Sequence, residues 1–195
     1  MPERGPYTKG LAKRNEILDA ALDLFSQNGY DRTSVREIAR RVDLSQAGLL
    51  HYFSSKEELF TEVLRRRDAR NELMYDENQG HPVTAGGLVA IVQHNSEEPG
   101  LVRLYVSMSA ESTEVDSPAR DFFEERYRNL RSDLSRDVKQ KQADGQIAAD
   151  LDPDALATLM IAAADGLQIQ WLLESDETDM GELLEQLWAA FRRVQ

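Results

Sequence analysis

The side chains best suited to a chemical task lie in residues 46–52, QAGLLHY. An exposed helix usually carries Glu and Lys, whereas this stretch offers an amide, two residues with little or no side chain, and two aromatic hydrogen-bonding groups. In the major groove of a DNA duplex, Gln46 would pair with adenine, Ala47 would contact a thymine methyl group, and Gly48 would let the backbone come close. The pattern therefore predicts a surface that reads base edges.

Catalytic and metal-binding patterns are missing from the sequence. His51, His81 and His94 do not have the spacing of metal ligands. The acidic pairs Glu97-Glu98 and Glu124-Glu125 occur in a generally acidic sequence, where solvation explains them without catalysis. The phosphate-loop patterns GxxxxGKS/T and GxGxxG are also absent. We therefore predict that the protein is not an enzyme and has no metal or cofactor.

A short amphipathic helix precedes this stretch. Ser34 is a suitable N-cap for it, with Glu37 three residues later completing a capping box, although Thr33 is an equally plausible cap. The residues at helical spacing on its apolar face are Val35, Ile38, Ala39 and Val42, and those facing outward are Arg36, Arg40 and Arg41. This helix is predicted to bury one side and present a positive other side.

A turn and a second helix follow. Asp43 occupies the turn, Leu44 returns to the core, and Ser45 is a natural cap for a helix from Gln46 to about Phe53. Leu49 and Phe53, four residues apart, are expected to bury against the preceding helix. The two helices and the turn together predict a helix-turn-helix.

Several further motifs flank these helices. They are Ala20-Ala21-Leu22, Leu24-Phe25, Gly29-Tyr30, Thr33 and Tyr52-Phe53-Ser54-Ser55-Lys56-Glu57-Glu58-Leu59. Together with the helix-turn-helix, they resemble the DNA-binding domain of TetR-family transcriptional regulators over about the first third of the chain. The resemblance implies an all-α fold: a three-helix DNA-binding domain in residues 1–55, then a helical ligand-binding and dimerisation domain in residues 56–195 that includes a connecting helix over 56–75.

The resemblance also suggests which residues meet double-stranded operator DNA. Tyr52 and Lys56 would hold phosphates. The full predicted contact set is Thr33, Ser34, Arg36, Ser45, Gln46, Ala47, Gly48, Leu50, His51, Tyr52 and Lys56. The chain departs from the family pattern at Asp43, where Gly is frequent, at Leu50, where Tyr often grips a phosphate, and at Gly48, where Thr or Ala often reads bases. An alternative function is therefore a TetR-like interaction protein with weakened DNA binding, whose N-terminal domain binds a protein partner instead.

Net charge is distributed unevenly along the chain. Residues 1–67 carry twelve Lys and Arg against ten Asp and Glu, a net charge of +2, while residues 68–195 carry eleven against twenty-five, a net charge of −14. A mildly basic N-terminal part, residues 1–67, and an acidic remainder suit a protein that contacts DNA phosphates only through its N-terminal part. The simpler alternative is that the acidic residues form a solvated surface without a partner. We expect that no apolar run approaches the length of a membrane span; the N-terminus lacks the pattern of a secretory signal and Cys is absent, so we expect a cytoplasmic protein.

Beyond the head, only helices are predicted. The expected ranges are 9–28 for the first helix and 56–75 for the connecting helix, and then, after a loop near residues 78–87, 83–96, 101–112, 118–144, 153–174 and 180–194. Pro118 and Pro153 are placed for first helical turns. Ser55 and Glu58 form a capping-box pattern that opens the connecting helix.

The last two helices have more apolar surface than one small core requires. A two-fold partner would bury the excess in a four-helix interface, and the family resemblance agrees. We therefore predict a homodimer that presents two recognition helices to a pseudo-palindromic site. The residues predicted for its interface are Leu156, Ile161, Gln168, Leu172, Leu184, Leu187, Trp188 and Phe191.

The middle helices would enclose the pocket for a small-molecule effector that such regulators have. Candidate lining residues are Tyr105, Met108, Phe123, Tyr127, Met160, Gln168 and Trp171. Aromatic and Met residues at helical spacing more often form plain core, and the sequence does not identify the effector. Residues 163–174 resemble the penultimate helix of the subgroup around the choline-responsive betaine regulator, from which choline is not inferred.

Overall fold

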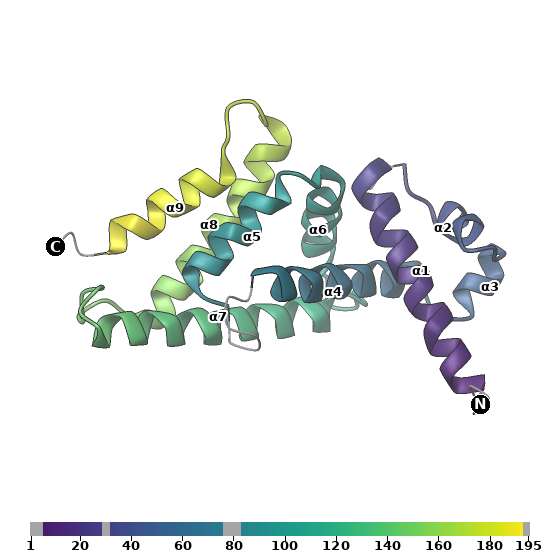
Figure 1. Cartoon of the computed structure of the whole chain (residues 1–195), viewed down its shortest axis with the longest axis horizontal. Coiled ribbons are helices and arrows are strands. Elements are labelled where there is room, and N and C mark those ends of the chain that lie inside the picture. The colour runs from purple at the N-terminus through teal and green to yellow at the C-terminus, as the bar shows by residue number, and fades with distance from the viewer. Residues whose placement is uncertain (1–5, 29–31, 76–82, 193–195) are drawn as a thin grey trace. The chain divides into compact units, whose positions relative to one another are not determined.

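The computed structural model describes residues 6–28, 32–75 and 83–192, with side chains placed for all of these except residues 6–8 and 72–75. Within these ranges the chain is helical, and its only β geometry is an isolated bridge between Ile147 and Arg192. The helices in chain order (Figure 1) are α1 (Pro6–Asn28), α2 (Val35–Arg41), α3 (Gln46–Leu50), α4 (Lys56–Tyr75), α5 (Ala85–Asn95), α6 (Pro99–Glu111), α7 (Arg120–Ala143), α8 (Pro153–Leu173) and α9 (Met180–Phe191). The all-α class predicted from the sequence is confirmed.

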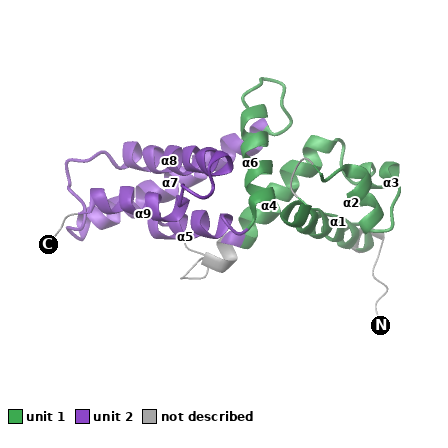
Figure 2. Ribbon diagram, turned by 90° about the horizontal axis from the view of Figure 1, so that it is seen from above, with its two compact units in different colours: residues 1–70, 98–119 green, residues 71–97, 120–195 purple. Residues whose placement is uncertain are grey.

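The chain divides into two compact units, coloured separately in Figure 2. Unit 1 comprises residues 1–70 and 98–119, and unit 2 comprises residues 71–97 and 120–195. The sequence-based division at residue 55 differs from this one, because most of α4 and all of α6 fall in unit 1. Helix α6 packs against α1, and this long-range contact has no local sequence signal.

Unit 1 is built on a small apolar core. Helix α2 packs on both α1 and α3, and Ile17, Phe25, Ile38, Leu49 and Phe53 are each no more than 1% exposed. The ring of Phe25 meets the ring of Phe60 from α4 edge to face, with 5.0 Å between centroids. The predicted apolar face of α2 is confirmed, since all four of its residues are buried.

Helix boundaries in unit 1 differ from the prediction at two places. Helix α1 begins at Pro6, before the predicted start at residue 9, and α3 ends at Leu50 instead of near Phe53. After α3, the Tyr52 amide donates to the Leu49 carbonyl at 2.9 Å, which tightens the chain into a turn before Ser55 caps α4. The Gly29-Tyr30 motif, and residues 76–82 with His81, lie outside the described residues.

In unit 2, α7 runs along α8, while α9 packs on both α5 and α8. Pro153 stands in the first turn of α8, as predicted, and the Asp152 carboxylate accepts from the amides of Asp154 and Ala155. Pro118 precedes α7 by two residues and so lies outside its first turn. Gly181 permits close packing, because a Cβ there would lie 2.8 Å from Gln93 Cβ of α5.

Helix α8 is the most apolar long helix. By length and composition it meets the requirement for a membrane span, with a mean hydropathy of 1.4, so the expectation that no run approaches a span is wrong for this segment. Core helices of globular proteins meet the same requirement. Only 33% of the apolar window is buried inside the subunit, which leaves α8 with an apolar surface still uncovered.

The turn between α2 and α3 has a left-handed backbone at Asp43, with φ of 56°. Aspartate tolerates this conformation better than most residues, and β-branched residues tolerate it poorly. Replacing Asp43→Val should lower the free energy of unfolding by about 1–2 kcal/mol. Urea unfolding of the purified protein measures this difference.

Asp43→Asn is the matched control for that measurement, because it removes the charge and keeps the tolerance for a left-handed backbone. Its stability should stay close to that of the wild type. Equal losses of unfolding free energy in the valine and asparagine variants would show that the charge of Asp43, and not its backbone conformation, stabilises this turn.

Candidate nucleic-acid interface

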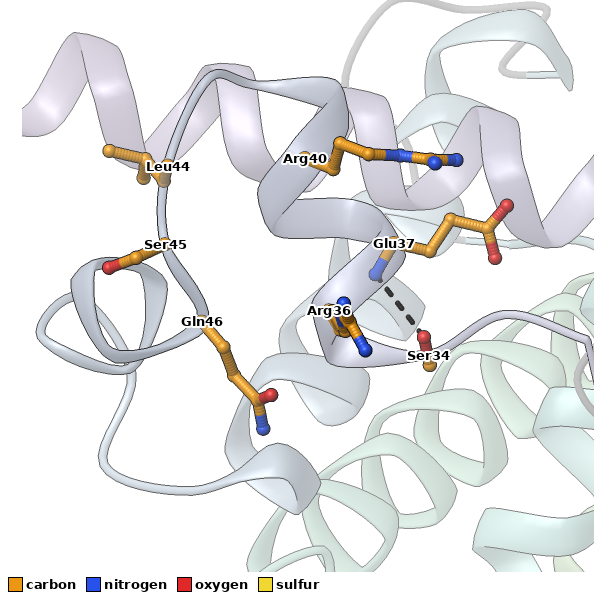
Figure 3. A pocket seen from close by; sticks show the side chains of 7 residues that line it. All are labelled: Ser34, Arg36, Glu37, Arg40, Leu44, Ser45 and Gln46. Carbon is orange, nitrogen blue, oxygen red and sulfur yellow. Dashed lines mark hydrogen bonds between the residues drawn. The ribbon is translucent and has the colours of Figure 1, made fainter.

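Two serines fix the starts of the helix-turn-helix helices. Ser34 Oγ accepts a hydrogen bond from the Glu37 amide at 3.2 Å (Figure 3), and Ser45 Oγ accepts one from the Gly48 amide at 3.0 Å. Ser34 is therefore the cap of α2. The structure also gives Gly48 a local role, because a Cβ there would lie 3.2 Å from Ser45 Oγ. A larger residue would crowd this cap, which sequence reasoning did not foresee.

The outer face of α3 has the character that its sequence indicated. Gln46, Ala47 and His51 are exposed, Leu50 is 37% exposed, and Tyr52 is partly exposed. Leu49 and Phe53 point inward, with exposures of 0% and 1%. The helix is thus held by two apolar anchors and presents its small and hydrogen-bonding side chains to the outside.

A hollow of about 530 Å³ opens beside this face (Figure 3). It is lined by Ser34, Arg36, Glu37, Arg40, Leu44, Ser45 and Gln46. A second hollow, of about 440 Å³, shares Ser34, Arg36 and Gln46 with the first and reaches Lys56 at the start of α4. The exposed cations Arg36, Arg40 and Lys56 thus surround a concave surface next to α3. Such a surface suits a phosphate backbone.

Thr33 differs from the other predicted contact residues. Its side chain is 6% exposed, and its hydroxyl donates to the Leu24 carbonyl at 3.3 Å. The hydroxyl is therefore engaged in joining α1 to the start of α2. We now interpret Thr33 as a residue that positions the interface, because its side chain faces the protein interior.

Ion pairs between α1 and α4 also position the interface, and sequence reasoning missed them. Arg14 Nη2 lies 3.0 Å from Glu62 Oε2, and Arg66 binds Asp19 with two nitrogens at 2.8 and 3.0 Å. The Arg14 guanidinium also lies 4.8 Å from the Phe53 ring centroid. The four-residue spacing of Glu62 and Arg66 is visible in the sequence, but only the fold shows that it faces α1.

Glu58 reinforces the start of α4. Its carboxylate accepts hydrogen bonds from both the amide and the hydroxyl of Ser54, each at 2.5 Å, while the Glu58 amide donates to Ser55 Oγ at 3.0 Å. The Ser54 side-chain hydrogen bond, with lesser help from the Ser54 amide and Arg14, holds the pKa of Glu58 below its ordinary value of 4.5 despite partial burial. The predicted capping box is present, with its return bond made to Ser54.

The predicted effector-pocket residues are distributed over both units. Tyr105 and Met108 lie on α6 in unit 1 and are buried. The other five lie on α7 and α8 in unit 2, where Tyr127 is partly exposed and its hydroxyl donates to Asp165 Oδ2 at 2.7 Å. Gln168 is 5% exposed, and its Oε1 has no hydrogen-bond partner within the part of the chain that the structure describes. Their assignment to an effector pocket stays a prediction.

The predicted dimer residues lie mostly inside their own subunit. Five of them are buried, namely Leu156, Ile161, Gln168, Leu184 and Trp188, while Leu172, Leu187 and Phe191 are partly exposed. The outer apolar surface is formed by different residues, Leu159, Ala162, Ile169 and Leu173 on α8 and Leu183 on α9. Hydropathy could not separate the two faces because both sides of α8 are apolar.

Comparisons with known proteins identify the chain. Residues 17–63 match the sequence profile of the tetR family of bacterial regulatory proteins, and residues 87–194 match the C-terminal profile of BetI-type transcriptional repressors. The second match covers more than half of the chain. The protein belongs to the TetR family. The resemblance seen in the sequence is therefore confirmed, including its BetI-like C-terminal half.

Relatives of this TetR-family protein include regulators with different names. It is 26% identical over 191 residues to the transcriptional repressor AcnR of Corynebacterium glutamicum, covering 95% of each chain. It is 24% identical over 177 residues to the A-factor receptor protein of Streptomyces griseus, covering 88% of this chain but only 59% of that protein. A solved regulator from Saccharomonospora viridis, in complex with choline, is 26% identical with a TM-score of 0.70, covering 95% of this chain and 100% of that one.

The Glu58 contacts lead to a testable expectation for this TetR-family protein. Glu58→Gln should lower the free energy of unfolding at pH 7 by about 0.5–1 kcal/mol, because a neutral amide accepts weaker hydrogen bonds than a carboxylate and the group is partly exposed. Since the folded pKa is lowered, the stabilisation is present above pH 4.5 and is lost as the pH falls through the folded pKa. Thermal unfolding across this range measures it.

The control for this expectation is Glu57→Gln, which removes the same charge from the same first turn of α4. If the two variants differ in their free energy of unfolding at pH 7, and this difference disappears in acid, the difference reports the Ser54 contacts. If the gap persists unchanged down to pH 3, the assigned role of Glu58 is incorrect.

Proposed function

We propose that the protein is a cytoplasmic, homodimeric repressor that leaves its operator when it binds a small-molecule effector. The observation that carries the proposal is the exposed outer face of α3, beside concave surfaces lined by Arg36, Arg40 and Lys56. Membership of the TetR family supports the same function. The relative named as a repressor supports the direction of regulation.

In the proposed complex, α3 enters the major groove of a pseudo-palindromic operator. Gln46, at the start of α3, would donate and accept hydrogen bonds at a base edge, and Ala47 would contact a thymine methyl group. Arg36 and Lys56 would neutralise phosphates on either side. Ser34 and Ser45 act mainly by capping, since their hydroxyls accept bonds from their own helices.

The proposed dimer forms through the uncovered stripe of α8, together with α9. Leu159 is 55% exposed, Ile169 is 49% exposed and Leu173 is 80% exposed, and they recur along one side of α8. Ala162 and Gly166 lie on the same side and would let a partner helix come close. Burial of this stripe would offset the cost of exposing so much apolar surface. Two subunits joined in this way would present two recognition helices to half-sites about 34–36 Å apart.

Effector control would work by linkage. An effector that prefers the conformation with badly spaced recognition helices weakens operator binding, and the operator weakens effector binding by the same factor. The related structure in complex with choline supports a small organic molecule as the effector. Helix α4 is the element proposed to transmit the shift, because it starts at Lys56 beside the proposed DNA-facing surface and is paired with α1 through Glu62 and Arg66.

Operator binding can be tested with the promoter region of the protein's own gene in gel-shift titrations. Gln46→Ala should weaken binding to that DNA by about 1–3 kcal/mol while barely changing binding to unrelated DNA. Arg36→Ala should weaken both and reduce the salt dependence by about one unit of slope. Arg120→Ala, which removes a surface cation from unit 2, should change neither.

A different outcome would favour the second candidate, an interaction protein. The 37% exposure of Leu50, where a phosphate-gripping Tyr is frequent in the family, is the observation behind that candidate. Weak binding by the wild type that is equal for all sequences, and unaffected by Gln46→Ala, would replace the operator-binding proposal with it.

The dimer can be tested by charging the stripe. Ile169→Glu should convert the dimer to a monomer, because a carboxylate would be buried against an apolar partner. Val115→Glu is the matched control, since Val115 is 80% exposed in a loop and its replacement should leave the mass unchanged. Light scattering after size-exclusion chromatography measures both. A dimer that persists with Ile169→Glu, or a monomeric wild type, contradicts the proposed interface.

A further inference from the structure

Arg67 on α4 is among the most deeply buried side chains of the protein. It is 2% exposed, and its guanidinium lies 4.8 Å from the ring centroid of Tyr105 on α6. Its Nη2 donates to Asp68 Oδ1 at 3.0 Å, while Nε and Nη1 are buried and have no hydrogen-bond partner among the described residues. All these groups lie in unit 1. Most of the donor capacity of this cation is therefore unused.

Neighbouring arginines on α4 and α1 are paired differently. Arg66 makes a bidentate contact with Asp19. Arg14 forms an ion pair with Glu62, and Arg70 forms one with Glu98. Each of these three is at least 31% exposed and meets a carboxylate from another helix or from a loop. Arg67 is almost fully buried, and among the described residues its ion pair is with the carboxylate of the next residue, Asp68. A buried guanidinium has five N–H donors, and leaving them unsatisfied is unfavourable.

We propose that Arg67 is the anchor for a carboxylate group on the effector, a refinement that rests on the proposed effector-controlled function. The unused N–H groups would donate to the carboxylate oxygens, in the charge-assisted geometry that arginine forms with carboxylates. A carboxylate carries one negative charge and so adds less repulsion beside Asp68 than a doubly charged phosphate. Tyr105 and Met108, three residues apart on α6 and both buried, would contact the apolar part of the same molecule.

This position connects the effector to the DNA-facing surface within one unit. Arg67 lies eleven residues after Lys56 on the uninterrupted helix α4, a distance of roughly 16 Å along its axis. The same stretch of α4 carries Glu62 and Arg66, which bind α1. A carboxylate that joins Arg67 of α4 to α6 therefore acts on the element that positions the head.

The test uses benzoate, hexanoate and glutarate as probes, with benzamide and hexanamide as neutral counterparts, in calorimetric titrations of the full-length protein at constant ionic strength. At least one carboxylate should bind the wild type saturably, and its neutral counterpart should not. Arg67→Met, which keeps a similar length and removes the charge, should weaken that binding at least about tenfold. Arg65→Met, at a neighbouring position of α4 where the side chain is 42% exposed, should retain it.

Thermal unfolding of both variants checks that they fold, and Arg67→Lys gives a second comparison, because it keeps the charge without the planar donor fork. The carboxylate assignment is overturned if none of the three acids binds the wild type, or if Arg67→Met binds them as tightly as the wild type does. Gel shifts on the same samples separate the two proposals. Failure of the wild type to bind any operator rejects the repressor, while a carboxylate response that depends on Arg67 would still stand.

Discussion

A five-residue helix cannot hold its own shape in water, and this constraint governs the head of the molecule. Isolated helices shorter than about 12–15 residues are marginal, so α3 depends on tertiary contacts for its orientation. These contacts are Leu49 and Phe53, which are 0% and 1% exposed, with Arg14 covering the Phe53 ring. The outer face can consist of small and polar groups only because the inner face is anchored in this way. The proposed recognition of base edges thus depends on the core formed with α1, α2 and α4.

Helix α4 links that core to the remainder of unit 1. Its first turn is held by Ser54, Ser55 and Glu58, its next turns are paired with α1, and beyond them Arg67 faces Tyr105 of α6. Polar contacts of this kind have specific geometries, so a small displacement of α4 changes several of them together. The helix is therefore suited to convert the binding of a ligand into a changed position of the helix-turn-helix, which the proposed linkage between effector and operator requires.

Local signals made much of the fold predictable from the sequence. The caps at Ser34 and Ser45, the turn at Asp43 and the start of α4 each involve residues within four positions of one another, and the structure shows all of them. Features that depend on distant partners were not predictable. Examples are the α1 contact that places α6 in unit 1, the burial of Thr33, and the choice between the two apolar sides of α8. Arg67 belongs to the same group. It lies in a run of three arginines, a pattern that predicts surface residues, and only the fold shows that it is buried.

The left-handed residue at the turn between α2 and α3 has a genetic consequence. Every aspartate codon becomes a glycine codon by a single adenine-to-guanine transition at its second base. Such a change at Asp43 would remove the steric strain of a backbone with φ of 56°. It would also raise the conformational entropy of the unfolded chain. The rigidity of the turn that orients α3 is therefore adjustable by a single-base substitution that leaves every residue of the proposed DNA-contact set unchanged.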